Sequence, residues 1–341
     1  MSYLRNRLLQ AFVTMYGIIT IGFVAIRLMP GGPREYLLAQ IQSNPQQYGL
    51  DSDASPQEIQ QALQQYVVTP PEQPIWEGYI DYMQGVIFEF DFGYSYIVDP
   101  GAPVVPLIAE AAPWTILISS VSIVYGLFVG IILGSVMAYY EGSKFDMGMT
   151  TAMILNSAIP YYVAAVVFLY FFAYQFQWFP NGGRYDPDTT PGLNWPFIQG
   201  VYYHAALPCL SLIATGFGGG ALGMRANSIR VIGSDYIHVA RLRGLSAYKI
   251  STRYLARNAI LPMYTGIVIG IGGILGGSVI LESIFAYEGM GLLMLEATLA
   301  RDFPLLTAAL IFTTFLFVLG TLLADFTYAL IDPRAEQSSM G

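Results

Sequence analysis

The chain has 341 residues, of which 55% are hydrophobic, 14% are aromatic and only 11% are charged. A soluble domain carries about a quarter charged residues. This composition therefore excludes an ordinary soluble protein and indicates a membrane protein with several spans. The formal net charge of -8 also makes a nucleic acid an unfavourable partner for the chain.

Six segments are long and apolar enough to cross a bilayer, which takes about 20 residues in a helix. In chain order they cover residues 8–29, 114–140, 150–176, 205–223, 262–284 and 305–331. The first is longer than the apolar part of a signal peptide and has no small-residue cleavage site, so we expect it to remain as a span. Pro160 and Pro208 predict breaks in the third and fourth spans.

These spans divide the chain into parts with different expected roles. Four parts follow in order: 1–29 with the N-terminus and first span, 30–110 as an extracytoplasmic subdomain, 111–334 as a core with five spans and the loop 225–261, and 335–341 as a cytoplasmic tail.

The basic residues predict the orientation, because cytoplasmic loops of membrane proteins carry an excess of Lys and Arg. Eleven of the fifteen bases fall on one side of the predicted spans: Arg5, Arg7, Lys144, Arg225, Arg230, Arg241, Arg243, Lys249, Arg253, Arg257 and Arg334. Only Arg34, Arg184 and Arg301 fall clearly on the other side. We therefore expect a multi-pass protein of the plasma membrane with both termini in the cytoplasm.

The outer segment 30–110 is too long for a simple connection and carries eleven acidic residues against one Arg. Ser55-Pro56-Gln57-Glu58 has the pattern of a capping box and predicts a helix that begins at Pro56. A second amphipathic stretch runs from Trp76 to Phe90. We expect an ordered subdomain that offers a docking platform to an external partner, the alternative being a solvated connector. The loop 185–203 is expected to be a structured turn region on the same side.

Glycines spaced four residues apart recur within the spans, where they let a second helix approach closely. They are Gly126, Gly130, Gly134, Gly216, Gly220, Gly266, Gly270, Gly273 and Gly277. Tight helix packing is the first interpretation of this spacing. The alternative is that the fifth span lines a path and slides against its neighbours.

The sequence predicts neither a catalytic nor a metal site, since it shows no nucleophile elbow, no metal-ligand spacing and no nucleotide-binding loop. Cys209 is the single cysteine and is expected to be buried in a helix. Glu282 and Asp325 fall near span ends, where water is available. No series of acids and histidines crosses the bilayer, which disfavours a proton-coupled transporter.

The segment between the fourth and fifth spans predicts a helical hairpin. A helix from Asp235 to Arg243 would end at Gly244 in a left-handed cap, and Ser246 would cap a second helix that runs to Ala259. Two stripes are predicted along the second helix: Lys249, Arg253 and Arg257 on one, and Tyr248, Leu255 and Ala259 on the other. The bases could simply contact lipid phosphates. The compact hairpin instead favours docking of a cytoplasmic partner, while nucleic-acid binding is disfavoured by the membrane setting.

This hairpin resembles the cytoplasmic loop of membrane permeases from binding-protein-dependent ATP-driven importers, in the dipeptide, oligopeptide and nickel branch. The branch's pattern DYxxxAxxxGL fits the residues Asp235, Tyr236, Ala240, Gly244 and Leu245. The general EAA-type motif would begin at His238, where the acid and first Ala are absent. Arg257-Asn258-Ala259 followed by Leu261-Pro262 fits the end of the loop.

Further segments extend the resemblance over nearly the whole chain. RLMPGGP at residues 27–33 resembles RLxPGDP with Gly32 in place of the acid, and DFGYS at 91–95 resembles GDLGxS. LESIFAYEGMG at 281–291 resembles ETVFxxPGLG with Glu288 where Pro is usual. ARDFP at 300–304 and DPR at 332–334 also fit. The outer loop after the first span resembles that of the B-type subunit.

The resemblance implies an all-α polytopic permease with six spans in the type I importer (MetI-like) fold. It implies a second permease subunit of the C type, two ATPase subunits or domains that bind ATP and Mg, and an extracytoplasmic substrate-binding protein. The implied ATPase-docking residues are Asp235, Tyr236, His238, Ala240, Arg241, Arg243, Gly244 and Leu245, with Arg257, Asn258 and Pro262 at the loop end. The chain would transport peptides or similar small solutes and need no cofactor of its own. The alternative is a self-contained secondary transporter or channel. Nickel chelates and sugars remain possible cargoes.

Overall fold

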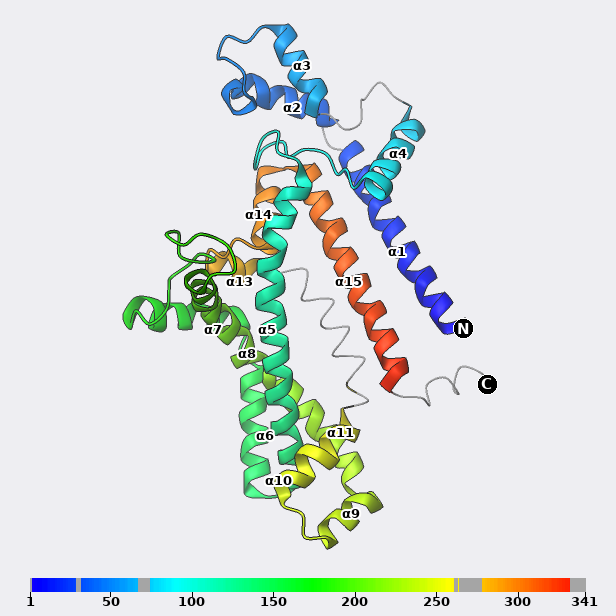
Figure 1. Ribbon diagram of the computed structural model, residues 1–341, viewed down its shortest axis with the longest axis vertical. Coiled ribbons are helices and arrows are strands. Elements are labelled where there is room, and N and C mark those ends of the chain that lie inside the picture. The colour runs from blue at the N-terminus through cyan, green and yellow to red at the C-terminus, as the bar shows by residue number, and fades with distance from the viewer. Residues whose placement is uncertain (1, 29–31, 67–73, 261–262, 264–277, 332–341) are drawn as a thin grey trace. The chain divides into compact units, whose positions relative to one another are not determined.

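The computed structural model describes residues 2–28, 32–66, 74–260, 263 and 278–331, which form helices and connecting loops (Figure 1). Contacts divide the chain into two compact units, Met1–Pro113 with Gly289–Leu319, and Trp114–Glu288 with Gly320–Gly341. The first unit contains α1 (Ser2–Arg27), α2 (Gly32–Ser43), α3 (Pro56–Tyr66), α4 (Ile75–Gln84), α14 (Met290–Ala300) and the start of α15 (Phe303–Ile331). The second contains α6 (Lys144–Ser157), α7 (Tyr161–Phe168), α8 (Trp195–Ile232), α9 (Asp235–Leu242), α10 (Ala247–Lys249), α11 (Ala256–Ala259) and α13 (Val279–Ile284). The helix α5 (Val104–Tyr139) begins in the first unit and continues into the second.

Four helices of the described chain are long and apolar enough to cross a membrane, namely α1, α5, α8 and α15. They overlap the first, second, fourth and sixth predicted spans. The helix α6 and the following helix Tyr161–Gln175 pass the same test together and overlap the third. Of the fifth predicted span, residue 263 and residues 278–284 are described. The glycines expected between Gly266 and Gly277 thus lie outside the described residues.

The third predicted span is broken, as Pro160 predicts. The helices on either side of the break are bent by 86° relative to each other. Pro160 precedes the first turn of α7 with an extended ψ of 138°, a position where its missing N–H leaves no hydrogen bond unmade. The second part of the span continues through the π-helical segment η3 (Leu169–Gln175).

The fourth span differs from the expectation in two ways. Pro208 lies inside α8 without breaking it, because packing on both sides of the proline holds the helix and only one backbone bond is lost. The helix also begins at Trp195, within the segment predicted as turns. There Asn194 caps it by accepting a hydrogen bond from the Phe197 N–H at 3.0 Å.

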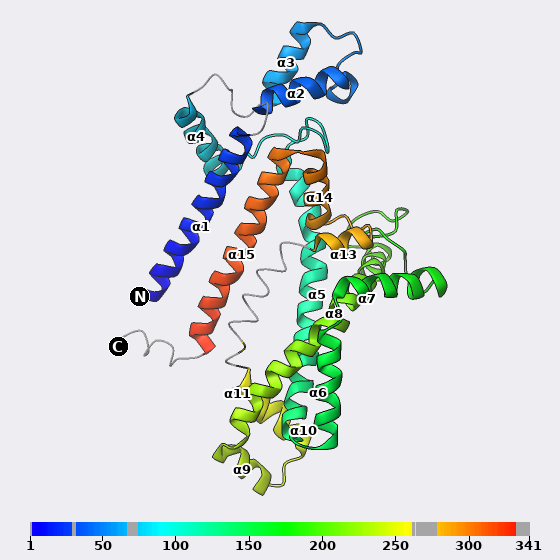
Figure 2. The ribbon, with the colours of Figure 1, turned by 180° about the vertical axis from the view of Figure 1, so that it is seen from behind.

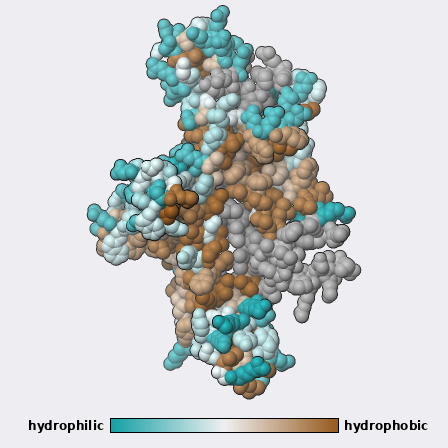
Figure 3. Space-filling view, in the orientation of Figure 1, coloured by the Kyte–Doolittle hydropathy of each residue, from teal (hydrophilic) through white to brown (hydrophobic). Residues whose placement is uncertain are grey.

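The predicted outer subdomain is ordered around a small core of its own. The side chains of Leu37, Ile41, Tyr48, Leu63 and Tyr96 are buried together. The capping box before α3 is confirmed: the Ser55 N–H donates to the Glu58 carboxylate at 2.7 Å, and the Glu58 N–H donates to the Ser55 hydroxyl at 3.4 Å. The bonds from Ser55 lower the pKa of Glu58. The surface over α2 and α3 is largely hydrophilic (Figure 3).

Within the first unit, α1 packs against α4 and the N-terminal part of α15. Gly22 of α1 allows the close approach, since a Cβ there would collide with the methyl group of Thr307 and lie 3.5 Å from the Tyr82 hydroxyl. Phe23 meets the rings of Tyr79 and Tyr82 at centroid distances of 5.3 and 5.7 Å. These contacts fix the position of α4 along α1.

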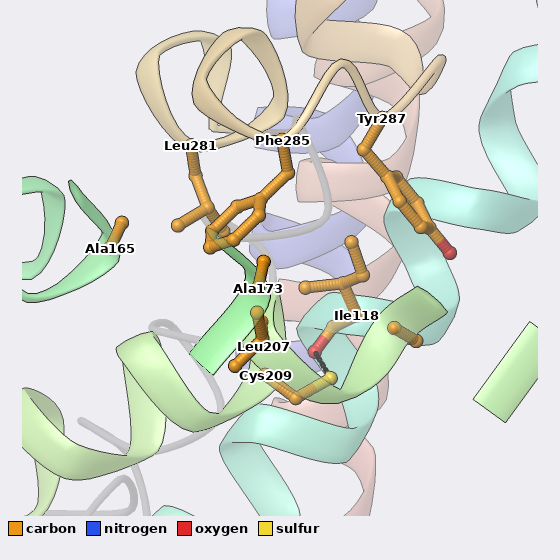
Figure 4. Packing of buried hydrophobic residues seen from close by; sticks show 9 residues of the cluster. Ile118, Ala165, Ala173, Leu207, Cys209, Leu281, Phe285 and Tyr287 are labelled. Atoms are coloured by element: carbon orange, nitrogen blue, oxygen red, sulfur yellow. Dashed lines mark hydrogen bonds between the residues drawn. The ribbon is translucent and has the colours of Figure 1, made fainter. Parts of the chain in front are cut away.

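A large core of the second unit lies where α13 covers α5 and α8. Leu281 and Phe285 point toward Ile118 of α5 and Leu207 of α8 (Figure 4). Cys209 is buried in the same cluster, as predicted, and its thiol donates to the Ile118 carbonyl at 3.8 Å. Glu282 corrects an expectation: it is 2% exposed, because α13 packs it inward against α5, where Thr115 donates to its carboxylate at 2.8 Å.

Part of the predicted glycine packing is present. A Cβ at Gly134 of α5 would lie 2.7 Å from the Met224 Cβ and 2.9 Å from the Arg225 nitrogen of α8, so only glycine permits this approach. Gly130 also faces α8, whereas Gly126, Gly216 and Gly220 face open space. The close contact between α8 and α6 is instead made at Gly218. The view from behind shows α6 running beside α8 (Figure 2).

Candidate functional site

The predicted hairpin, residues 235–259, is present in the second unit. Its first helix, α9, ends in the left-handed cap expected at Gly244, whose φ is +68°. The Gly244 N–H donates to the Arg241 carbonyl at 2.9 Å and the Leu245 N–H to the Ala240 carbonyl at 3.3 Å, which is the bond pattern of a Schellman motif. The second arm begins at Ser246, whose hydroxyl accepts from the Lys249 N–H at 3.4 Å.

The two arms of the hairpin share a buried face. Ile237 and Ala240 of the first arm pack with Ile250 and Leu255 of the second, and Leu245 is half-buried at the turn between them. The second arm runs through the π-helical segment η4 (Ile250–Leu255). Because the turns of this segment are wider than those of an α-helix, Tyr248 and Leu255 do not lie on the same face of the second arm. Tyr248 is 68% exposed, so the predicted stripe with Leu255 and Ala259 is wrong for this residue.

Six of the eight predicted docking residues form the outer surface of the hairpin, while Ala240 is buried and Leu245 is half-buried. The six exposed residues are Asp235, Tyr236, His238, Arg241, Arg243 and Gly244. Ala240 supports the fold of the hairpin instead. Arg257 and Asn258 are exposed at the end of the second arm, and Pro262 lies outside the described residues. Their docking role stays a prediction.

Sequence reasoning missed the exposed apolar side chains Val239 and Leu242 on this surface, and it did not predict that Tyr248 is exposed beside them. Leu242 is 75% exposed, Tyr248 is 68% exposed and Val239 is 45% exposed. Around them, Arg243, Lys249 and Arg253 make no ion pair with any residue that the structure describes. An exposed apolar centre with unpaired bases around it is the pattern of a protein interface. The apolar residues close to Gly244 in the sequence could have predicted this exposed apolar surface.

Two charged contacts attach the hairpin and its base to the spans. The Arg241 guanidinium lies 5.3 Å from the centre of the Tyr139 ring, at the end of α5. Deeper in the second unit, Arg225 of α8 donates to both carboxylate oxygens of Asp146 at 2.6 Å. The Gly142 N–H also donates to Asp146 at 3.0 Å, so this carboxylate ties the turn between α5 and α6 to α8. Neither contact was predicted from the sequence.

In the first unit, two of the motif segments meet at one buried carboxylate. Asp302 of ARDFP is fully buried and accepts at 2.6 Å from the hydroxyl of Ser95 of DFGYS. The same oxygen accepts from the N–H groups of Tyr96 and Ile97 at 2.9 Å and of Val98 at 3.1 Å. Burial, followed by the charge of Asp302, raises the pKa of Tyr96. Asp302 therefore fixes the loop before α5 to the start of α15.

In the second unit, the segment LESIFAYEGMG is held by the loop that follows η3. The Gly183 N–H donates to the Phe285 and Ala286 carbonyls at 3.2 and 3.3 Å. Glu288 stands where the family pattern has Pro, and it forms an ion pair with Arg184 at 2.6 Å. The Arg184 guanidinium also lies 5.4 Å from the centre of the Trp114 ring. Glu288, which replaces the Pro of the family pattern, thus binds a specific partner in this chain.

Comparisons with known proteins agree with the fold. The family model for the binding-protein-dependent transport system inner membrane component matches residues 130–337. The oligopeptide transport system permease protein AppB of Bacillus subtilis is 30% identical, with 98% of this chain and 99% of AppB covered. The permease protein OppB of Haemophilus influenzae is 29% identical over 98% of this chain and 99% of its own. A structure of the MetNI methionine ABC transporter matches with a TM-score of 0.53 over 67% of this chain and 97% of that chain, at 15% identity.

The chain belongs to the family of binding-protein-dependent transport system inner membrane components. It is a helical membrane permease, the component of an ABC importer that forms the passage through the membrane. Its likeness to MetNI confirms the MetI-like fold predicted from the motifs. The self-contained transporter or channel, the alternative left open by the sequence, is disfavoured by this membership.

Proposed function

We propose that the chain is the B-type permease subunit of an ATP-driven importer and forms half of the path for peptides or similar small solutes. The peptide cargo is supported by relatives of full length, AppB and OppB, both named for oligopeptide transport. A second permease subunit of the C type would supply the other half. An external binding protein would deliver the solute to the outer face.

The surface of the hairpin is the observation that supports the proposed mechanism most directly. The hairpin has an exposed centre at Leu242, and its bases Arg243, Lys249 and Arg253 form no ion pair within the described part of the chain. These features suit a partner whose surface has an apolar cleft with acidic rims. We assign this partner to two cytoplasmic ATPase subunits or domains, which would bind ATP and Mg. This chain would hydrolyse nothing and need no cofactor. Both of its termini would lie in the cytoplasm, on the same side as the hairpin.

Transport would then be driven by motion of the hairpin. Closure of the ATPase pair on ATP moves the two hairpins together, and each hairpin carries the motion to the spans through Tyr139 and through the base of α8. The path opens to the outside, takes the solute from the binding protein, and returns to the inward-facing state after hydrolysis.

The docking role is tested by the substitution Leu242→Ser in the complete transporter. Burial of a leucine contributes about 1.5–3 kcal/mol, and about 1.4 kcal/mol corresponds to a factor of ten in affinity. We therefore expect the ATPase subunits to dissociate about tenfold more readily, with a matching loss of ATPase activity stimulated by the binding protein. Affinity can be measured by titrating purified ATPase subunits onto the permease pair in nanodiscs.

The matched control is Leu193→Ser, which removes a leucine that is even more exposed than Leu242 from the loop before α8. It should leave ATPase affinity unchanged. Equal affinities for both variants and the parent protein would contradict a docking role for the hairpin.

A further inference from the structure

The helix α4 and the π-helical segment η2 (Gly85–Glu89), which follows it, present three distinct faces. Tyr79, Tyr82 and Val86 form the first, which is packed against α1 and its neighbours. The second is apolar but exposed: Trp76 is 63%, Ile80 is 45% and Ile87 is 43% accessible. The third is polar: Asp81 and Gln84 are exposed and Glu77 is half-buried. Within each face the residues recur at helical spacing, so the three faces run side by side along the helix.

Contacts with α1 fix the depth of this helix. The Thr20 and Tyr79 hydroxyls are 2.8 Å apart, and the ring of Phe23 packs on Tyr79 and Tyr82. Thr20 and Phe23 precede the end of α1 at Arg27 by seven and four residues. At 1.5 Å per residue they lie about 6–10 Å inside the end of an apolar spanning helix. The part of the packed face at Tyr79 and Tyr82 is therefore at the depth of the boundary between headgroups and acyl chains. Val86 of η2 packs deeper, near Met15 and Ile19.

Ile87 on the exposed apolar face lines one groove with Phe12 and Tyr16, which belong to the exposed apolar surface of α1. That surface carries the side chains Leu8, Leu9, Phe12, Val13, Tyr16, Ile21, Val24 and Leu28. For a helix that spans a bilayer, such a surface faces lipid. A neighbouring face at the same depth has the same surroundings, whereas the acidic face of α4 needs water.

We infer that α4 and η2 lie in the membrane interface, with Trp76, Ile80 and Ile87 inserted among the lipid acyl chains. Glu77, Asp81 and Gln84 face the water above them. The occupant of the apolar face is thus the bilayer itself rather than a soluble protein. Tryptophan is a preferred residue at this level, because its ring is apolar and its N–H finds a polar partner there. The part of the outer segment that remains for a soluble partner is the subdomain of α2 and α3.

Site-directed spin labelling tests this assignment in the complete transporter, reconstituted in nanodiscs. Single cysteines in a Cys209→Ala background replace Trp76, Ile80 or Ile87 on the apolar face, and Glu77, Asp81 or Gln84 on the polar face. Oxygen concentrates in hydrocarbon, whereas a polar nickel complex stays in water. We expect a severalfold higher ratio of oxygen to nickel accessibility on the apolar face. A label at Ile21 of α1 is the lipid reference, and a label at Leu193 is the aqueous reference.

Two outcomes would overturn the inference. Equal nickel accessibility on both faces would place the helix in water. Exclusion of both quenchers from the three apolar sites would show that another protein covers them. A measurement without labels checks the result. In the parent protein, lipids brominated on their acyl chains should quench the tryptophan fluorescence that Trp76 contributes, which is the part absent from Trp76→Phe. Absence of this quenching would likewise refute membrane insertion.

Discussion

At the scale of single residues, Asp302 shows how one carboxylate can organise a loop. One of its oxygens accepts from the Ser95 hydroxyl and from three consecutive backbone N–H groups. The other oxygen accepts from the Leu305 N–H at 3.4 Å and so caps the first turn of α15. Hydrogen bonds to a charged acceptor are stronger than neutral ones. A neutral amide of similar shape cannot replace these contacts, because its NH₂ group would face donors.

We predict that Asp302→Asn loosens the loop at Tyr96, Ile97 and Val98. Leaving buried donors without a charged acceptor costs roughly 3 kcal/mol, which corresponds to about a hundredfold change in local opening. Hydrogen exchange of these amides should accelerate accordingly. Asp53→Asn serves as the control, because Asp53 is exposed and lies in the segment 30–110 that also contains this loop. Unchanged exchange in Asp302→Asn would show that the loop is held by other contacts.

At the scale of helices, the ends of helices could be predicted from adjacent residues, whereas contacts between distant helices could not. The caps at Ser55, Ser246 and Gly244 could be predicted, because each depends on a few adjacent residues. The attachment of α8 to the turn between α5 and α6 could not be predicted. It joins Arg225 to Asp146 across 79 residues, and nothing in the local pattern of either residue points to the other.

We predict that the Asp146–Arg225 pair has a coupling free energy of about 2 kcal/mol. The Asp146 side chain is 3% exposed and binds Arg225 through two oxygens, so loss of one partner leaves a charge with little solvent. A double-mutant cycle with Asp146→Asn and Arg225→Gln, followed by chemical denaturation in detergent, measures this value.

The pair Arg184–Glu288 is the control for this cycle. Its distance is also 2.6 Å, but the Glu288 side chain is 64% exposed, so its coupling should stay below about 1 kcal/mol. Equal coupling energies for the two pairs would contradict the role given to burial.

At the scale of the whole molecule, the proposed function requires partner subunits that hydrolyse ATP. Family membership shows that it is a permease component of an ABC importer, and the hairpin is the surface through which we propose that ATPase motion enters. The hairpin has a buried face, a capped turn and contacts with α5, so it can transmit force as a unit rather than as a flexible loop.

We predict that Gly244→Pro uncouples this hairpin. Proline requires a φ near -65°, whereas Gly244 has +68°, so the turn must change shape. Binding-protein-stimulated ATP hydrolysis and transport should both be lost while the permease pair still assembles. Gly244→Asn is the matched control, since Asn tolerates the left-handed conformation and a Cβ at this site meets no atom within 4 Å. Stimulation equal to the parent protein in Gly244→Pro would refute the coupling role.

The sequence by itself determined the membrane class, most span positions, the capped hairpin and the family, because these depend on composition, short-range periodicity and motifs of adjacent residues. Only the tertiary structure decided which motif residues meet. Ser95 and Asp302 lie 207 positions apart and form one hydrogen-bonded site, while Glu282 is buried although its position suggested water. The tertiary structure also divided α4 into three faces, because its packed and its lipid-facing residues are both apolar or aromatic. Only the position of α1 distinguishes them.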